Sequence, residues 1–193
     1  INSNGGINGK TIELFIEDNK NLALDGVNAF NAVMLKDPDM FISTMSSSTV
    51  AINSLAMESK KPMFVSLVFA DVLSKNENAV SFFPRTEDDS TATIRDMKIN
   101  MISSVGILYI NTEYGVASMN ALLEKAKSDG MTVYVETFNG EGTDYQTPLL
   151  KLLENKPQAV YIAGINSNPI IGSIKAKNSN VKIYTNLIPV LGS

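Results

Sequence analysis

The chain has 193 residues, with 16 Lys and Arg against 20 Asp and Glu, a net charge of −4, and neither His nor Cys. The acidic balance and the lack of a basic cluster argue against nucleic acid or an anionic membrane surface as the partner. The missing His and Cys remove the commonest general base, the commonest metal ligand and any thiolate chemistry. We therefore expect no metal, no cofactor and no enzymatic activity. No apolar run approaches the ~20 residues that cross a bilayer, so we expect no membrane insertion in this stretch.

Taken in chain order, short apolar runs alternate with segments of helical periodicity. After a glycine-containing turn at residues 2–9, the patterns predict strands over 11–17, 40–42, 63–65, 105–110, 131–135, 159–163 and 181–185. They predict helices over 22–34, from the serines at 46–48 to about 59, from 88–90 to about 101, and over 115–128, 144–153 and 169–177. A longer irregular stretch is expected at 67–78.

Strands that alternate with amphipathic helices indicate parallel sheets with right-handed crossovers. Ligands of such sheets bind beyond the carboxyl ends of the strands. The positions that inform on function are therefore the turns that follow strands: 43–49, 66–71, 111–115, 164–168 and 186–189.

The hydroxyl run Ser46-Ser47-Ser48-Thr49 stands between a predicted strand and a predicted helix. The first amides of a helix lack internal partners and carry partial positive charge, so a carboxylate or a phosphate can bind there. Ser and Thr at this place can also donate hydroxyl hydrogen bonds to the ligand. The alternative is that one serine caps the helix and the others are solvated loop.

Several further segments carry a family resemblance in order and in register: 1–10 with 12–18, 46–49, 83–86, 107–109 with 113–115, 143–145 and 159–164. With these segments the chain resembles the type I periplasmic binding proteins. It is most similar to the Leu/Ile/Val-binding group, the substrate receptors of branched-chain amino acid ABC transporters. The resemblance covers nearly the whole chain.

The resemblance implies an α/β fold of two doubly wound parallel-sheet, Rossmann-like lobes with the ligand between them. Residues 1–86 would be part of lobe one and residues 87–193 part of lobe two. Because family members are longer, we expect the chain to be a fragment, incomplete at both ends. The first lobe would then expose strand edges and an apolar sheet face.

The resemblance also implies ligand contacts in the turns of both lobes, at Ser46, Ser47, Ser48, Val68, Phe69, Ala70, Tyr114, Ile165 and Asn166. The three serines match the turn that holds the ligand carboxylate, and Tyr114 matches an aromatic residue at the second-lobe rim. Phe69 stands where the family more often has a small or hydroxyl residue. Ile165 and Asn166 stand where the family commonly has an aromatic residue. For Tyr114 the alternative is a plain interface tyrosine.

The function that the resemblance implies is a periplasmic or extracellular substrate-binding protein that delivers its ligand to the membrane permease of an ABC transporter. The ligand would be a small carboxylate, either a branched-chain amino acid or a related apolar or aromatic acid. One alternative is the ligand-sensing ectodomain of a membrane receptor. A doubly wound α/β enzyme is the other, but the Gly-x-Ser-x-Gly elbow of a serine nucleophile is absent.

Acidic residues in the predicted turns bear on the kind of carboxylate. Amino-acid receptors of the family supply an acid from lobe two for the ligand's ammonium, because a buried cation without a counter-charge is costly. The turns at 165–168 and 184–189 contain no acid. Asp71 and Glu113 lie near predicted ligand-binding turns, but neither matches the family's position. We therefore expect a preference for acids that lack the amine.

Overall fold

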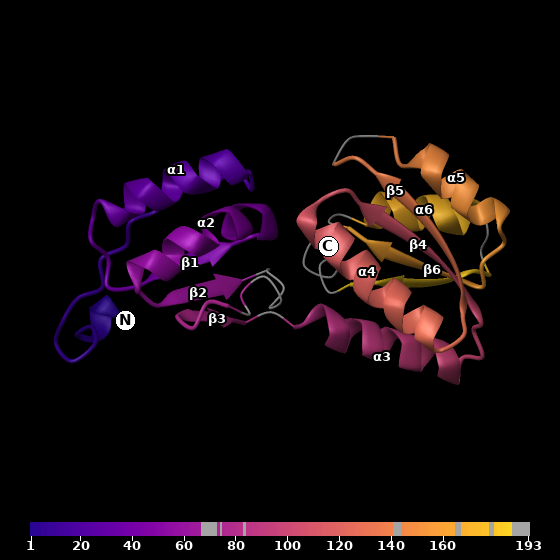
Figure 1. Cartoon of the computed structure of the whole chain (residues 1–193), viewed down its shortest axis with the longest axis horizontal. Coiled ribbons are helices and arrows are strands. Elements are labelled where there is room, and N and C mark those ends of the chain that lie inside the picture. The colour runs from indigo at the N-terminus through magenta and orange to yellow at the C-terminus, as the bar shows by residue number, and fades with distance from the viewer. Residues whose placement is uncertain are drawn as a thin grey trace.

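A computed structural model describes residues 1–66, 73, 75–82, 84–140, 144–164, 167–177 and 180–186 of the chain. Two parallel sheets, each with helices of its own, lie next to one another along the long axis of the molecule (Figure 1). We call the part from η1 (Asn2–Asn4) to β3 (Ala79–Ser81) the first lobe. The part from α3 (Thr86–Ile99) to β7 (Lys182–Thr185) is the second lobe.

The first lobe is a three-stranded sheet in the order β1-β2-β3 with two helices on one face. Its other elements are β1 (Phe41–Thr44), β2 (Met63–Ser66), α1 (Ala23–Met34) and α2 (Ser46–Ser59). Burial alternates along β1, as expected for a strand with one covered face. The buried Phe41, Met63 and Val65 pack against both helices, and the ring of Phe30 on α1 meets that of Phe41 edge to face at 5.3 Å.

The opposite face of this sheet carries exposed apolar side chains. Ile42 and Phe82 are each 71% exposed and Val80 is 50% exposed. The ring of Phe64 stacks on that of Phe82 with the centroids 5.6 Å apart. Among the described residues no helix packs on this face, which agrees with the expected apolar sheet face of the first lobe.

The second lobe is a four-stranded sheet in the order β5-β4-β6-β7, covered on both faces. Its other elements are β4 (Ser104–Ile110), α4 (Glu113–Ser128), β5 (Thr132–Phe138), α5 (Gln146–Glu154), β6 (Ala159–Ala163) and α6 (Asn168–Lys177). All five residues of β6 are buried, which is typical of a strand between two layers of helices. Alternate residues of β4 and β6 pack against α3 and α4 on one face and against α5 and α6 on the other.

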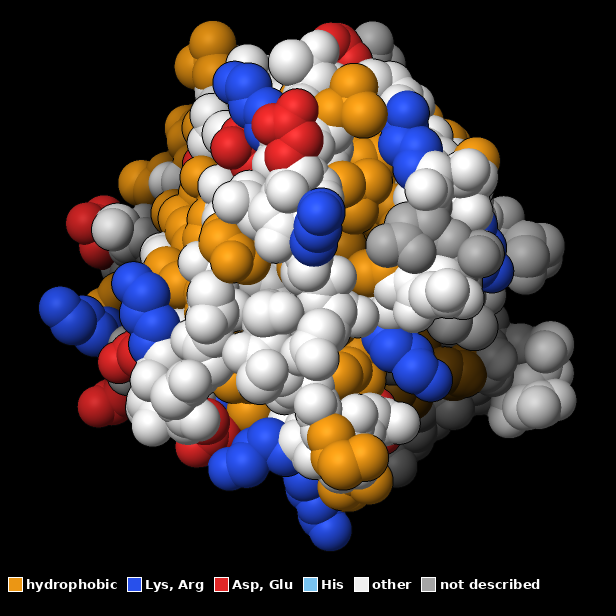
Figure 2. Space-filling view, turned by 90° about the vertical axis from the view of Figure 1, so that its right-hand side faces the viewer, with side chains coloured by type: hydrophobic (Ala, Val, Ile, Leu, Met, Phe, Trp, Pro, Cys, Tyr) orange, Lys and Arg blue, Asp and Glu red, His pale blue; other side chains and the backbone are white. Residues whose placement is uncertain are grey.

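The outer end of the second lobe is a mixed polar surface. Figure 2 shows this end, with lysine and arginine side chains scattered among acidic, neutral and apolar ones. None of the helices in the described ranges is long and apolar enough to span a bilayer.

The α/β class with parallel sheets and flanking helices is confirmed, and most predicted elements form within a few residues of their expected bounds. The strand predicted over 11–17 is wrong, because these residues form no ladder with another strand. Leu14 and Ile16 of this segment are 75% and 84% exposed, so in the described structure the apolar side chains that predicted a covered face are not covered. Strand β3 was not predicted.

Candidate functional site

The serine turn lies where β1 ends and α2 begins. Met45, between them, has φ 71° and ψ 144°, and Ser46 is the first residue of the helix. Met45 makes no side-chain capping bond, since a thioether is only a weak acceptor. The positive end of α2 is therefore available to an outside acceptor.

The three serines have different surroundings. Ser48 is 1% exposed, its Oγ donates to the Thr44 carbonyl at 3.0 Å, and its Cβ lies against Gly26 of α1. From its place in α2, Ser48 thus contacts both α1 and the end of β1. Ser46 is 7% exposed, and its Oγ has no hydrogen-bond partner among the described residues. The Oγ of Ser47 donates to the carboxylate of Glu113 in the second lobe.

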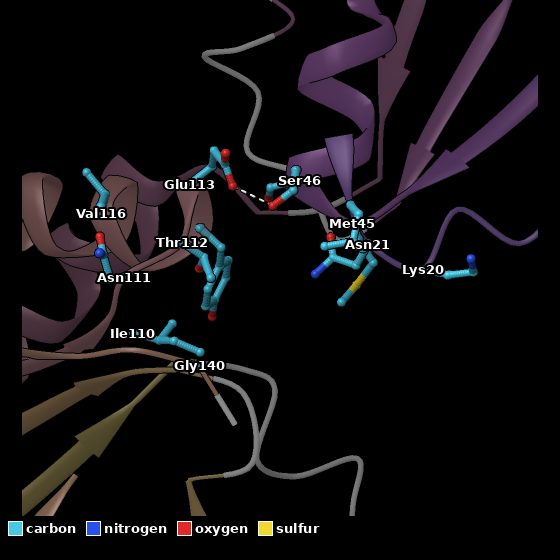
Figure 3. A pocket seen from close by; sticks show the side chains of 13 residues that line it. Lys20, Asn21, Met45, Ser46, Ile110, Asn111, Thr112, Glu113, Val116 and Gly140 are labelled. Atoms are coloured by element: carbon cyan, nitrogen blue, oxygen red, sulfur yellow. Dashed lines mark hydrogen bonds between the residues drawn. The ribbon is translucent and has the colours of Figure 1, made fainter. Parts of the chain in front are cut away.

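A cavity of about 830 Å³ lies between the two lobes. The first lobe contributes residues from the loop before α1 and from the serine turn, and the second lobe contributes residues that follow β4 and β5 (Figure 3). The lining residues are Lys20, Asn21, Leu22, Met45, Ser46, Ser47, Ile110, Asn111, Thr112, Glu113, Tyr114, Val116 and Gly140. Ser46, Ser47 and Tyr114 of the predicted ligand contacts meet in this cavity, whereas Ser48 does not line it.

The start of α4 positions the second-lobe wall. The Thr112 Oγ accepts a hydrogen bond from the Gly115 amide at 3.3 Å and caps the helix. A Cβ on Gly115 would lie 1.9 Å from the Ile110 carbonyl oxygen, so only glycine permits this close approach of α4 to the end of β4. As a result Glu113 and Tyr114 line the second-lobe side of the cavity.

Asp89 and Tyr161 form a partly buried polar pair close to Tyr114. The Tyr161 hydroxyl, on β6, donates to an Asp89 carboxylate oxygen on α3 at 3.1 Å. Burial raises the pKa of Tyr114 well above its usual range, and the charge of Asp89 adds to this shift. Tyr114 is therefore a neutral phenol at every physiological pH, with an apolar ring and a polar tip.

Asp89 gives a testable pH dependence. Burial raises the pKa of Asp89, more than the hydrogen bond from Tyr161 lowers it. When the folded-state pKa of a carboxyl is raised, the free energy of unfolding of the protein falls as the pH rises. The fall begins near pH 4, about the pKa of Asp in the unfolded chain, and ends above the folded-state pKa. We expect Asp89→Asn to gain more free energy of unfolding over the parent than Asp88→Asn does. The difference between the two gains should grow with pH across this window and then stay constant.

Urea unfolding between pH 4 and pH 7 would measure this margin. Asp88→Asn is the matched control because it removes the same charge from the same first turn of α3, where acids interact favourably with the helix dipole. The amide oxygen introduced at position 89 can still accept the Tyr161 hydrogen bond. A margin that does not change with pH would contradict the role assigned to burial.

Charged groups are few in the described lining. Lys20 pairs with Asp25 at 3.2 Å, and Lys20 is 63% exposed. Glu113 is the acid of the lining, and it bonds to Ser47. Within the described ranges no group of three acidic side chains is placed to hold a metal ion.

Five predicted contacts lie outside the described residues: Val68, Phe69, Ala70, Ile165 and Asn166. Sequence reasoning missed the loop before α1, which supplies Lys20, Asn21 and Leu22, although this loop follows the segment predicted as a strand over 11–17 and was therefore recoverable by the same rule. Asn111 and Thr112 were recoverable in principle, since the turn after β4 was singled out. Glu113 was noted there as an acid but not as a ligand contact.

Residues 1–182 match the family model described as periplasmic binding protein. The chain belongs to the periplasmic binding protein family. Membership in this family implies an extracytoplasmic location. No curated protein is similar enough to this periplasmic binding protein to count as a match.

Solved structures share the fold of this periplasmic binding protein. One is a leucine-binding protein from Thermotoga maritima, with TM-score 0.81, 19% identity, and coverage of 95% of this chain and 54% of that one. A second is an ABC transporter solute-binding protein from R. palustris in complex with benzoate, with TM-score 0.87, 15% identity, and coverage of 97% and 54%. A third is a solute-binding protein of an ABC transporter from Rhodopseudomonas palustris BisB5 in complex with 3,4-dihydroxybenzoic acid, with TM-score 0.82, 14% identity, and coverage of 98% and 55%.

At these identities the likeness establishes the fold, which is that of the type I periplasmic binding proteins. The chain spans about half the length of the solved structures that it matches. The proteins that it resembles are ligand-binding and transport proteins rather than enzymes.

Proposed function

We propose that this chain is part of an extracytoplasmic substrate-binding protein of an ABC transporter, close to the Leu/Ile/Val-binding group. It binds a small carboxylate, a branched-chain amino acid or a related apolar or aromatic acid, in the cavity between residues 1–86 and 87–193. Its protein partner is the membrane permease of the transporter.

The observation that carries this proposal is the uncapped start of α2 at the cavity. Within the described part of the chain the buried Ser46 hydroxyl has no hydrogen-bond partner, and a buried hydroxyl without a hydrogen bond costs about 1–3 kcal/mol. A ligand carboxylate at this place would accept from the Ser46 hydroxyl and from the first amides of α2. A single carboxylate would then satisfy both the buried Ser46 hydroxyl and the unpaired amides of α2.

The remaining walls favour an apolar ligand body. Ile110 and Val116 line the second-lobe side, and the ring of Tyr114 lies beside them. Such a mixture of apolar walls and a few polar groups is typical of small-molecule sites. The similar structures include a leucine-binding protein and complexes with benzoate and with 3,4-dihydroxybenzoic acid, and all three compounds are small carboxylates with an apolar or aromatic body.

A thermal-shift panel tests the proposal and the expected ligand class together. The panel pairs leucine, isoleucine, valine and phenylalanine with their 2-oxo and deamino analogues and includes benzoate. A ligand present at 100 times its Kd adds about 2.7 kcal/mol to the free energy of unfolding, which raises the Tm by roughly 5–10 °C in a chain of this size. We expect shifts of this order for acids that lack the amine and smaller shifts for the amino acids, because Glu113 is already bonded to Ser47.

The control is 3-methylbutylamine, which has the apolar body of leucine and its amine but no carboxylate, and it should produce no shift. A shift with this amine equal to that of the acids would contradict the carboxylate site. Shifts from the amino acids alone would overturn the expected preference while leaving the carboxylate site intact.

A further inference from the structure

The contact between Glu113 and Ser47 places a protein carboxylate at the start of α2. These residues are 66 positions apart and belong to different lobes. Figure 3 shows the Glu113 side chain reaching from the first turn of α4 across to the first turn of α2. The position that a ligand carboxylate would take thus already has an acid beside it.

Electrostatics favours Glu113 in this position. It lies in the first turn of its own helix and contacts the first turn of α2, so the positive ends of both helices attract its charge. Lys20, the cation of the described lining, is paired with Asp25. The start of α2 therefore has a negatively charged partner before any ligand arrives.

A ligand carboxylate that binds Ser46 and the α2 amides would bring a second negative charge close to Glu113. Two carboxylates at one helix start repel each other, and the Ser47 hydroxyl has a single proton to donate. The ligand must therefore replace Glu113 as the acceptor of the Ser47 hydrogen bond, or bind despite the repulsion from the Glu113 carboxylate. A second carboxylate on the ligand would increase the repulsion.

We propose that Glu113 is a specificity-determining residue that occupies the start of α2 in the unliganded protein and is displaced from Ser47 by a ligand carboxylate. It selects for monocarboxylates against dicarboxylates that share the same ring. This inference rests on the proposed carboxylate site at α2.

Calorimetry with benzoate and isophthalate tests the inference, because the two ligands share a ring and differ by one carboxylate. We expect Glu113→Gln to tighten benzoate binding by about two- to fivefold, the range of a partly exposed charge pair, and isophthalate binding by more. The glutamine keeps an acceptor for the Ser47 hydroxyl and removes only the charge. The matched control is Glu124→Gln, which removes the same charge from an exposed position of α4, about 16 Å further along the helix.

Unchanged or weaker benzoate affinity in Glu113→Gln would overturn the inference, and so would equal gains in both glutamine variants. If the parent protein binds neither acid, the proposed function has failed for these ligands, and a ligand-free cycle decides the role of Glu113. The cycle compares the urea unfolding midpoints of Ser47→Ala, Glu113→Gln and the double variant. Non-additive shifts would support the contact, and additive shifts would exclude it.

Discussion

Ser47→Asp is expected to weaken carboxylate binding at least about tenfold without unfolding the protein. The substitution places a fixed negative charge in the first turn of α2, where the ligand carboxylate is proposed to bind. Two unit charges ~4 Å apart repel by about 4 kcal/mol at an effective dielectric of ~20. Partial exposure of the position weakens this repulsion, so we expect an affinity loss of at least about tenfold, or ~1.4 kcal/mol. Calorimetry with the best ligand of the panel measures it.

The fold should survive this substitution, because an acid in the first turn of a helix interacts favourably with its dipole. Ser54→Asp is the matched control, since it adds the same charge at an exposed position of α2, two turns further along. The new carboxylate would also face Glu113, so the substitution is repeated in the Glu113→Gln background, where the loss should persist. Unchanged affinity in Ser47→Asp would contradict the assignment of the serine turn.

Gly115→Ala is expected to lower both stability and ligand affinity. The added Cβ would lie 1.9 Å from the Ile110 carbonyl oxygen, and the contact is with backbone, which cannot rotate away. Forcing extra atoms into a packed site costs about 1–3 kcal/mol. The start of α4 must shift to relieve the clash. Because Glu113 and Tyr114 belong to this helix start and line the cavity, the shift would displace them. Urea unfolding and calorimetry on the same preparation measure the two effects.

Gly172→Ala is the control for this substitution. Gly172 is an exposed residue inside α6, and a Cβ added there meets no atom within 4 Å. Because alanine is the better helix former, this variant should gain about 0.5–1 kcal/mol in the free energy of unfolding. A Gly115→Ala variant as stable as the parent would show that the end of β4 and the start of α4 can separate freely.

The sequence predicted well the features that depend on neighbours along the chain. The unbroken apolar run at 159–163 predicted a buried strand, and all of β6 is buried. The serines at 46–48 predicted a helix start after a strand, and α2 begins at Ser46. Hydrophobic period and the orphan amides of a helix start are both local properties, so the residues themselves carry this information.

The sequence failed where a residue's role depends on distant partners. The segment 11–17 has the alternation of a strand, but a strand forms only when another strand accepts its hydrogen bonds, and the described structure gives it none. Of three adjacent serines, the sequence could not tell that Ser48 packs against Gly26 while Ser46 and Ser47 line the cavity.

What the sequence determined by itself is therefore the parallel α/β pattern and the position of the helix start at Ser46, where we propose that a carboxylate binds. Only the tertiary structure decided that Glu113, in the other lobe, already holds the Ser47 hydroxyl, and that Lys20 and Asn21 border the same cavity. The physical reason is distance along the chain. A helix start is determined by the few residues around it, whereas the charge that faces it is set by how the two sheets meet.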